Sequence, residues 1–189
     1  MSVRLSELPT SKRWQQQLYP VPVVAALICR EIAHVRHCLL IRRISQPYAG
    51  KWALVGVRWK FGETLSQAVT REVREETRLT TDFVRLRGFG NERIFPHQPD
   101  GMGAQYSIFV CEVSASREQP REQDEGEVAW FNEKQLDDMW LKKDMAPTDY
   151  LILKHYLTAE ELFVCFEAEV VSDITGNATS EIRRFDKIP

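Results

Sequence analysis

The strongest pattern in this chain is the stretch Gly62-Glu63-Thr64-Leu65-Ser66-Gln67-Ala68-Val69-Thr70-Arg71-Glu72-Val73-Arg74-Glu75-Glu76-Thr77. Residues 65–77 are typical of a helix, with Thr64 as its N-cap. On a helical wheel at about 100° per residue, the apolar side chains fall on one stripe. The members of this stripe are Leu65, Ala68, Val69 and Val73.

Three carboxylates of this helix lie where apolar side chains are expected. Glu72 and Glu76 fall inside the stripe and Glu75 falls at its edge. A Glu-rich helix usually has a solvated face of ion pairs, but here that interpretation fails on geometry. Buried carboxylates are unfavourable unless they are neutralised, and two of them about 5 Å apart repel by about 3 kcal/mol at an effective dielectric of 20. Together with Glu63, this cluster of oxygen donors predicts a site for Mg²⁺ or Mn²⁺.

A divalent cation held by carboxylates alone suits phosphate chemistry. Such cations bridge phosphate oxygens, neutralise charge in the transition state and acidify a water nucleophile. A further Glu can then act as the base.

At these residues the sequence resembles the Nudix family. Gly62-Glu63, followed by Arg71-Glu72-Val73-Arg74-Glu75-Glu76 and Leu79, is similar to the Nudix box at residues 57–79. The box is a glycine, five residues, Glu, seven residues, then Arg-Glu-apolar-x-Glu-Glu-x-Gly-apolar. Its spacing is kept, because Glu63 stands eight positions before Arg71.

The resemblance extends beyond the box, over roughly residues 21 to 157. Trp52-Ala53-Leu54-Val55-Gly56 is similar to the segment that usually precedes the box, and Val128-Ala129-Trp130-Phe131 is similar to the strand that closes the family's core. The resemblance implies a Nudix-like α/β/α sandwich. The pattern of segments independently predicts an α/β (α+β) fold, a mixed β-sheet flanked by helices, because strands outnumber helices without regular βαβ alternation.

Two positions depart from the box, since Val57 and Arg78 replace its glycines. Arg78 is expected just past the helix, in a left-handed turn that costs a non-glycine residue about 1 kcal/mol. In the family the backbone near the first glycine approaches the metal, so here Gly56 would have to supply that close approach. These departures leave an alternative open, a catalytically silent Nudix-fold regulator that binds a nucleotide.

The resemblance implies a pyrophosphohydrolase that cleaves a nucleoside diphosphate linked to another moiety, as in a nucleotide sugar or a nucleoside triphosphate, by Mg²⁺-assisted water attack. It assigns catalytic roles to Glu75, Glu76 and Arg71, with Arg71 orienting the glutamates. It assigns the metal to Glu72, Glu75 and Glu76, supported by Glu63. A further base or ligand is expected from the loop before the closing strand. Its candidates are Glu125 and Glu127, although the same loop could simply be solvated.

Aromatic side chains outside the box are candidates for stacking on a base. We expect Trp52, Phe95 and Tyr106 to bind substrate, although each residue of this kind is more often part of the core. Pro96 lies 17 residues past Leu79, which is a weak hint of a nucleotide sugar.

Composition sets the remaining expectations. The chain has 189 residues, of which 43% are hydrophobic and 28% charged, and this excludes a disordered chain. We expect an N-terminal arm at 1–19, a Nudix domain at 20–157 and an extension at 158–189 that packs on the domain or on a dimer partner. The net charge of −2 argues against nucleic acid as a main partner.

The location and assembly of the protein are also predicted from patterning. Residues 1–20 have no apolar core fit for a signal peptide, and no apolar run is long enough to span a membrane. These features favour a cytoplasmic protein without a membrane partner. The apolar half of Leu162–Val171 favours pairing with a sheet edge and a homodimer.

Four cysteines stand at positions 29, 38, 111 and 165. This wide spacing is typical of neither a zinc ribbon nor a redox motif. We therefore expect buried free thiols.

Overall fold

The computed structural model describes residues 20–97, 103–116, 118–121, 123, 126–158, 163–173, 175 and 177–188. The predicted arm at 1–19 lies outside these residues, and so does Glu125. The elements are β1 (Val21–Ile32), β2 (Val35–Arg43), β3 (Trp52–Ala53), β4 (Val55–Arg58), α1 (Leu65–Thr77), β5 (Thr81–Phe95), β6 (Ala104–Ala115), β7 (Gly126–Asn132), α2 (Glu133–Leu141), α3 (Pro147–Thr158), β8 (Val164–Ser172) and β9 (Ala178–Ile188).

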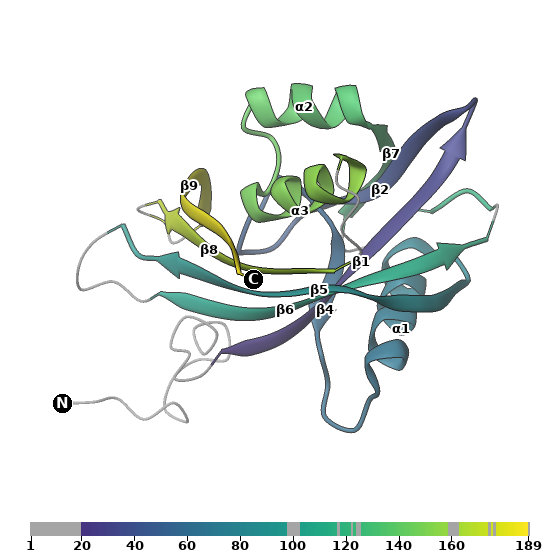
Figure 1. The fold of residues 1–189 in the computed structure, drawn as a ribbon, viewed down its shortest axis with the longest axis horizontal. Coiled ribbons are helices and arrows are strands. Elements are labelled where there is room, and N and C mark those ends of the chain that lie inside the picture. The colour runs from purple at the N-terminus through teal and green to yellow at the C-terminus, as the bar shows by residue number, and fades with distance from the viewer. Residues whose placement is uncertain are drawn as a thin grey trace.

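The strands form one mixed sheet in the order β3-β2-β1-β6-β5-β8-β9, with β4 joined to β1 and β7 joined to β2. The pairs β1–β6 and β5–β8 are parallel, whereas the other pairs are antiparallel. Helix α1 covers one face of the sheet, and α2 and α3 cover the other (Figure 1). Each face has its own apolar core, with Val69 and Val73 in one and Leu136 and Leu153 in the other. The predicted sandwich of helices around a mixed sheet is confirmed.

Strand β1 is the point where the sheet divides. Its first half, Val23 to Ala26, pairs with β4, and its second half, Cys29 to Ile32, pairs with β2. Because β2 and β4 leave β1 at different places, the sheet opens between them. The largest cavity described below lies in this opening.

Helix α1 has the bounds that the sequence predicts. Its N-terminus is closed by a capping box, in which Thr64 and Gln67 each accept a hydrogen bond from the other's backbone N–H. Its C-cap is Arg78, with φ 62° and ψ 7°, so the expected left-handed turn is present without a glycine. The Arg78 N–H donates to the carbonyl of Arg74 at 3.0 Å, which closes the helix.

Two segments differ from the sequence-based expectation. Residues 91–103 contain two prolines and two glycines, a composition typical of a loop, but β5 continues to Phe95 because both β6 and β8 pair with it. At Gly90 a Cβ would lie 2.4 Å from the ring of Phe166, so this glycine makes room for the buried ring. The C-terminal end is polar, yet residues 178–188 form β9. Strand β8 is thereby enclosed between β5 and β9.

Among the residues that the structure describes, no helix has the length and apolar character needed to cross a membrane.

Candidate active site

A cavity of about 760 Å³ lies in the opening between β2 and β4. Gly56 and Arg58 line it from β4, and Ile41 and Arg43 line it from β2. Helix α1, strands β5 and β6 and the start of α3 complete its walls. The cavity therefore collects side chains from segments that are far apart in the sequence.

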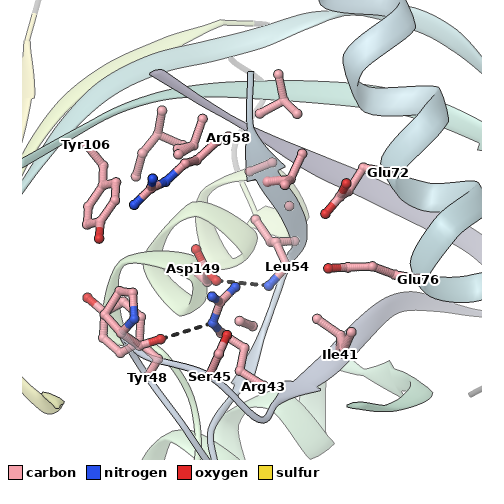
Figure 2. A pocket seen from close by; sticks show the side chains of 18 of the residues that line it. Ile41, Arg43, Ser45, Tyr48, Leu54, Arg58, Glu72, Glu76, Tyr106 and Asp149 are labelled. Carbon is pink, nitrogen blue, oxygen red and sulfur yellow. Dashed lines mark hydrogen bonds between the residues drawn. The ribbon is translucent and has the colours of Figure 1, made fainter. Parts of the chain in front are cut away.

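The wall made by α1 carries two buried carboxylates. Glu72 is 3% exposed and Glu76 is 5% exposed, and their spacing of four residues places them on one face of the helix. Figure 2 shows both carboxylates pointing from α1 into the cavity, on the side opposite Tyr48 and Tyr106. The wheel argument placed these two side chains correctly within the apolar stripe.

Arg71 joins the other carboxylates of the predicted cluster. Its Nε donates to Glu63 Oε1 at 2.6 Å and its Nη2 to Glu63 Oε2 at 3.1 Å. Its Nη1 donates to Glu72 Oε2 at 3.0 Å and to Glu75 Oε2 at 2.8 Å. The hydrogen bond from Arg71 is the main reason that the pKa of Glu63 is lowered, and the same carboxylate raises the pKa of Arg71. One guanidinium thus fixes three of the four predicted glutamates.

The four glutamates do not form a single ligand set in this arrangement. In the described part of the chain, no three Asp, Glu, His or Cys side chains come together as they would around a metal ion. Glu63 and Glu75 are turned to Arg71, and Glu75 is 52% exposed. The donor chemistry nevertheless suits a divalent cation, because Glu72 and Glu76 are buried oxygen donors that face an open cavity.

The far wall of the cavity contains a second pair of buried acidic groups. Glu92 accepts a hydrogen bond from the Tyr48 hydroxyl at 2.7 Å. Asp149 accepts one from the Leu54 N–H at 2.9 Å, as Figure 2 shows. Tyr106, which is 8% exposed, lines the same cavity. This wall can offer hydrogen bonds and an aromatic side chain to a ligand.

Burial raises the pKa of both carboxyl groups of this second pair. Burial raises the pKa of Asp149 to about 7, and the nearby charge of Glu92 adds to the effect. Burial likewise raises the pKa of Glu92. The pKa of the Tyr48 hydroxyl is also raised, first by burial and then by Glu92. A protonated carboxyl can donate a hydrogen bond, whereas an ionised one only accepts.

Three basic side chains also line the cavity. Arg58 and Lys60 line the cavity and are exposed. Arg43, whose Nε donates to the Pro47 carbonyl at 3.0 Å, lines it from β2. These cations can offset the charge of an anionic ligand.

Gly56 and Val57 lie where the Nudix box has its first glycine. A Cβ on Gly56 would lie 2.6 Å from the Val24 carbonyl oxygen, because β4 pairs closely with β1. Gly56 is therefore required by strand pairing, and it lines the cavity. Val57, the next residue, packs against the core on the α1 side of the sheet and also lines the cavity.

The other predicted site residues have different surroundings. Trp52 is 9% exposed, packs edge-on against Phe131 with ring centroids 4.7 Å apart, and does not line the cavity. Phe95 stands at the end of β5, also away from the cavity walls. Of the three predicted stacking residues, Tyr106 alone lines the cavity. Glu127 is exposed on β7, opposite Arg42 of β2.

Sequence reasoning missed the second acidic pair and its tyrosine. Glu92 precedes a segment rich in proline and glycine, which is typical of a loop, whereas in the structure β5 carries its side chain into the cavity. Asp149 lies in the first turn of α3, where an acidic residue is ordinary for a helix. Tyr48 lies in a turn between strands and gave no signal of burial. Only the folded arrangement brings these residues together.

The family follows from comparison with known proteins. Residues 19–156 match the family model described as NUDIX domain. The chain therefore belongs to the Nudix family.

Three curated relatives are similar to parts of this chain. A Caenorhabditis elegans protein, named as a nudix hydrolase, is 32% identical over 60% of this chain and 29% of its own length. The ADP-ribose pyrophosphatase of Methanocaldococcus jannaschii is 35% identical over 41% of this chain and 43% of its own length. Nucleoside triphosphatase NudI of Enterobacter sp. strain 638 is 31% identical over 62% of this chain and 88% of its own length. The match thus spans less than half the length of the first two relatives.

Solved structures support the fold. The MutT protein from Bacillus halodurans has a TM-score of 0.66 and 22% identity, and the match covers 88% of this chain and 97% of that one. A NUDIX hydrolase from Nitrosomonas europaea has a TM-score of 0.63 and 21% identity, over 83% and 82% of the two chains. At this identity the likeness concerns the fold.

Proposed function

We propose that this protein is a pyrophosphohydrolase, dependent on Mg²⁺ or Mn²⁺, that cleaves a nucleoside diphosphate linked to another moiety. One observation carries the proposal: the buried pair Glu72 and Glu76 faces a cavity whose opposite wall can hold a nucleoside. Two carboxylates buried within an apolar stripe destabilise a fold by themselves, but they suit a cation-binding function.

In this proposal Glu72 and Glu76 hold the cation, and Arg71 keeps Glu63 and Glu75 beside them. A divalent cation bound there would neutralise phosphate charge and lower the pKa of a water nucleophile. Arg58 and Lys60 would offset the remaining phosphate charge. Glu75, half exposed at the edge of the cluster, and Glu127 are the described candidates for the base that accepts the proton of the attacking water.

The nucleoside would lie against the wall formed by Tyr48, Glu92, Tyr106 and Asp149. Tyr106 offers a ring for stacking. Because the pKa of Asp149 is about 7, this carboxyl can donate or accept near neutral pH. A ligand that lacks matching groups would leave buried polar atoms unpaired, and that is a strong source of selectivity. Selectivity for base or ribose would thus reside on this wall.

The names of the relatives support two substrate classes. One relative is an ADP-ribose pyrophosphatase and another is a nucleoside triphosphatase. Both reactions cleave a phosphoanhydride bond next to a nucleoside phosphate, so both agree with the same cation site and nucleoside wall.

The test is a panel of ADP-ribose, other nucleotide sugars and nucleoside triphosphates, assayed with Mg²⁺ or Mn²⁺ for release of nucleoside monophosphate, phosphate or pyrophosphate. We expect turnover of at least one class and its loss with excess EDTA. Full activity in EDTA would overturn the metal assignment. Tight nucleotide binding by calorimetry without any product would instead favour the silent regulator.

Assembly and location remain predictions. The C-terminal hairpin of β8 and β9 is part of the sheet, and β9 forms its edge. We propose that this edge supports a homodimer in a cytoplasmic protein. Light scattering of the purified chain, with and without residues 163–189, would test the assembly.

A further inference from the structure

Two cysteines that are nine positions apart in the sequence lie directly opposite each other in the β1–β2 hairpin. The turn contains Ala33 and His34, with φ of 50° and 65°, and the register runs from Ile32 opposite Val35 to Cys29 opposite Cys38. A two-residue turn of this kind is closed by a hydrogen-bonded pair, and hydrogen-bonded and non-hydrogen-bonded pairs then alternate along the hairpin.

Counting outward from the turn, Cys29 and Cys38 form the fourth pair, which is non-hydrogen-bonded. At such pairs the Cα atoms are about 4.5 Å apart and the side chains are at their closest. That separation lies within the range that a disulfide requires. Both side chains point to the same face of the sheet, since directly opposite residues share a face.

The surroundings differ for the two thiols in a way that suits stepwise oxidation. Cys38 is 1% exposed, whereas Cys29 is half-buried and lines a second cavity of about 390 Å³. Arg36, two residues before Cys38 and on the same face, lines that cavity as well. A hydrogen bond from Cys38 and the charge of Arg36 lower the pKa of Cys29, against the opposing effect of burial. The accessible sulfur is therefore also the more acidic one.

We propose that Cys29 and Cys38 form a reversible redox pair, in which hydrogen peroxide converts the two thiols into a disulfide across the β1–β2 hairpin. In the first step the Cys29 thiolate attacks one peroxide oxygen, the O–O bond breaks and Cys29 becomes a sulfenic acid while one water leaves. In the second step the Cys38 sulfur attacks the Cys29 sulfur, the S–O bond breaks and a second water leaves. The two thiols lose two electrons, and the peroxide is reduced to two waters.

The other two cysteines lack this arrangement. Cys111 in β6 is buried and lies opposite Ala26 and Leu86, and neither neighbour is a cysteine. Cys165 in β8 lies opposite Phe89 and Ile188, and neither neighbour is a cysteine. The disulfide is thus expected to be selective, and Cys165 supplies a matched control.

The test uses the full chain treated with stoichiometric hydrogen peroxide, then alkylated and digested with trypsin without reductant. Cleavage after Arg13, Arg30, Arg36 and Arg42 separates the two cysteines. We expect one linked species, residues 14–30 joined to 37–42, two hydrogens lighter than the sum of its parts. Dithiothreitol should release both peptides. Cys165→Ser should give the same linked species.

Two variants keep the proposal falsifiable if one of them folds poorly. Cys38→Ser should stop at a sulfenic acid on Cys29 that dimedone traps, and Cys29→Ser should leave Cys38 unmodified. The oxidised wild type should melt roughly 5 to 10 °C higher than the reduced form, because the disulfide closes a short loop of the unfolded chain. Linkage through Cys111 or Cys165, or oxidation of Cys29 beyond sulfenic acid while Cys38 stays a thiol, would overturn the proposal.

Discussion

Two pairs of buried carboxylates face one cavity, and their surroundings differ. Glu72 and Glu76 come from one helix, beside a guanidinium that fixes the neighbouring glutamates. Glu92 and Asp149 come from β5 and α3, and each accepts a hydrogen bond from a neutral donor, the Tyr48 hydroxyl or the Leu54 N–H. The helical pair belongs to a dense cluster of carboxylates, whereas the second pair is enclosed and has the positive charge of Arg43 nearby.

This difference indicates two tasks for the same functional group. A cluster of carboxylates is stabilised by a cation, so the helical pair suits metal binding. An enclosed pair lowers its energy by keeping a proton, so the second pair suits hydrogen bonding to an uncharged part of a ligand. The distance in sequence between the pairs allows one to vary without the other. The following changes test whether the two tasks are separate.

The largest effect is expected for Glu76→Gln. Because it removes a charged cation ligand but keeps the size of the side chain, kcat/KM should fall at least about 100-fold. The metal-free melting temperature should hold or rise, since a negative charge leaves a crowded cluster. Glu181→Gln, at an exposed position of β9, is the matched control. An inactive variant that is also unfolded would indicate a structural ion-pair network.

A smaller loss is expected for Arg71→Lys. Lysine keeps the charge but cannot bridge Glu63, Glu72 and Glu75 with separate N–H groups. Metal affinity and activity should each fall by about 10- to 100-fold, a typical cost of losing an outer partner of metal ligands. Mn²⁺ titration by calorimetry would measure the affinity. Unchanged affinity would show that the arginine does not position the ligands.

Asp149→Asn tests the second pair through pH. Folding raises the pKa of Asp149 from about 3.8 to about 7, so the native state holds a proton that the unfolded state releases. The bound proton therefore adds up to about 4 kcal/mol to the free energy of unfolding. This contribution is fully present below pH 4 and is lost as the pH rises from about 4 to 7. The asparagine side chain keeps an acceptor for the Leu54 N–H but has no such titration.

The Asp149→Asn variant should therefore be more stable than the wild type at pH 8 and should lose the decline in stability between pH 4 and 7. Its KM for nucleotide should rise by about tenfold or more while the metal affinity stays unchanged. Asp138→Asn, at an exposed position of α2, is the control. Unfolding by urea across pH, beside Mn²⁺ titration, measures both quantities. Loss of metal affinity would contradict the separation of the two pairs.

The difference between the pairs also explains how much the sequence could predict. Glu72 and Glu76 lie on one helix, so a wheel places them, and their conflict with the apolar stripe is visible before folding. Glu92 and Asp149 are 57 residues apart in the sequence, and neither breaks a local pattern. Their meeting depends on β5 extending through residues 91–95, which depends on pairing with both β6 and β8. Long-range pairing of this kind leaves little trace in local sequence.

The same reasoning applies to the smaller features. The helix bounds, the Thr64 cap and the left-handed turn at Arg78 are local properties and were predicted. Trp52 was a plausible stacking residue by type, but it packs against Phe131 in the core, and only tertiary packing decides this. The paired thiols of Cys29 and Cys38 likewise follow from hairpin register rather than from a motif.

Val57→Gly tests whether metal binding by Glu72 and Glu76 needs a glycine at position 57. Gly56 and Val57 both line the cavity, and Val57 also packs against the α1-side core. The variant should therefore lose stability, by about 1 to 3 kcal/mol, because it removes a partly buried side chain and adds backbone entropy. Its turnover per folded molecule should change little. Activity that appears only in the glycine variant would favour the silent regulator.

The smallest effect is expected at Arg78, which ends the helix that carries the metal-binding pair. Its φ of 62° is the left-handed conformation that glycine adopts freely. Arg78→Gly relieves that strain, but it also removes the hydrogen bond from Arg78 Nε to Gln123 Oε1 at 2.7 Å. Arg78→Ala removes the same bond and keeps the strain, so the difference between the two variants isolates the backbone effect. We expect the glycine variant to be more stable than the alanine variant by about 1 kcal/mol, which is about 2 to 4 °C in melting temperature for a chain of this size.

Turnover should be equal in the glycine and alanine variants of Arg78, because the turn lies after the last glutamate of the cluster. A tenfold difference in activity would show that the helix end also positions Glu76, and the metal-binding pair would then depend on the turn as well as on Arg71.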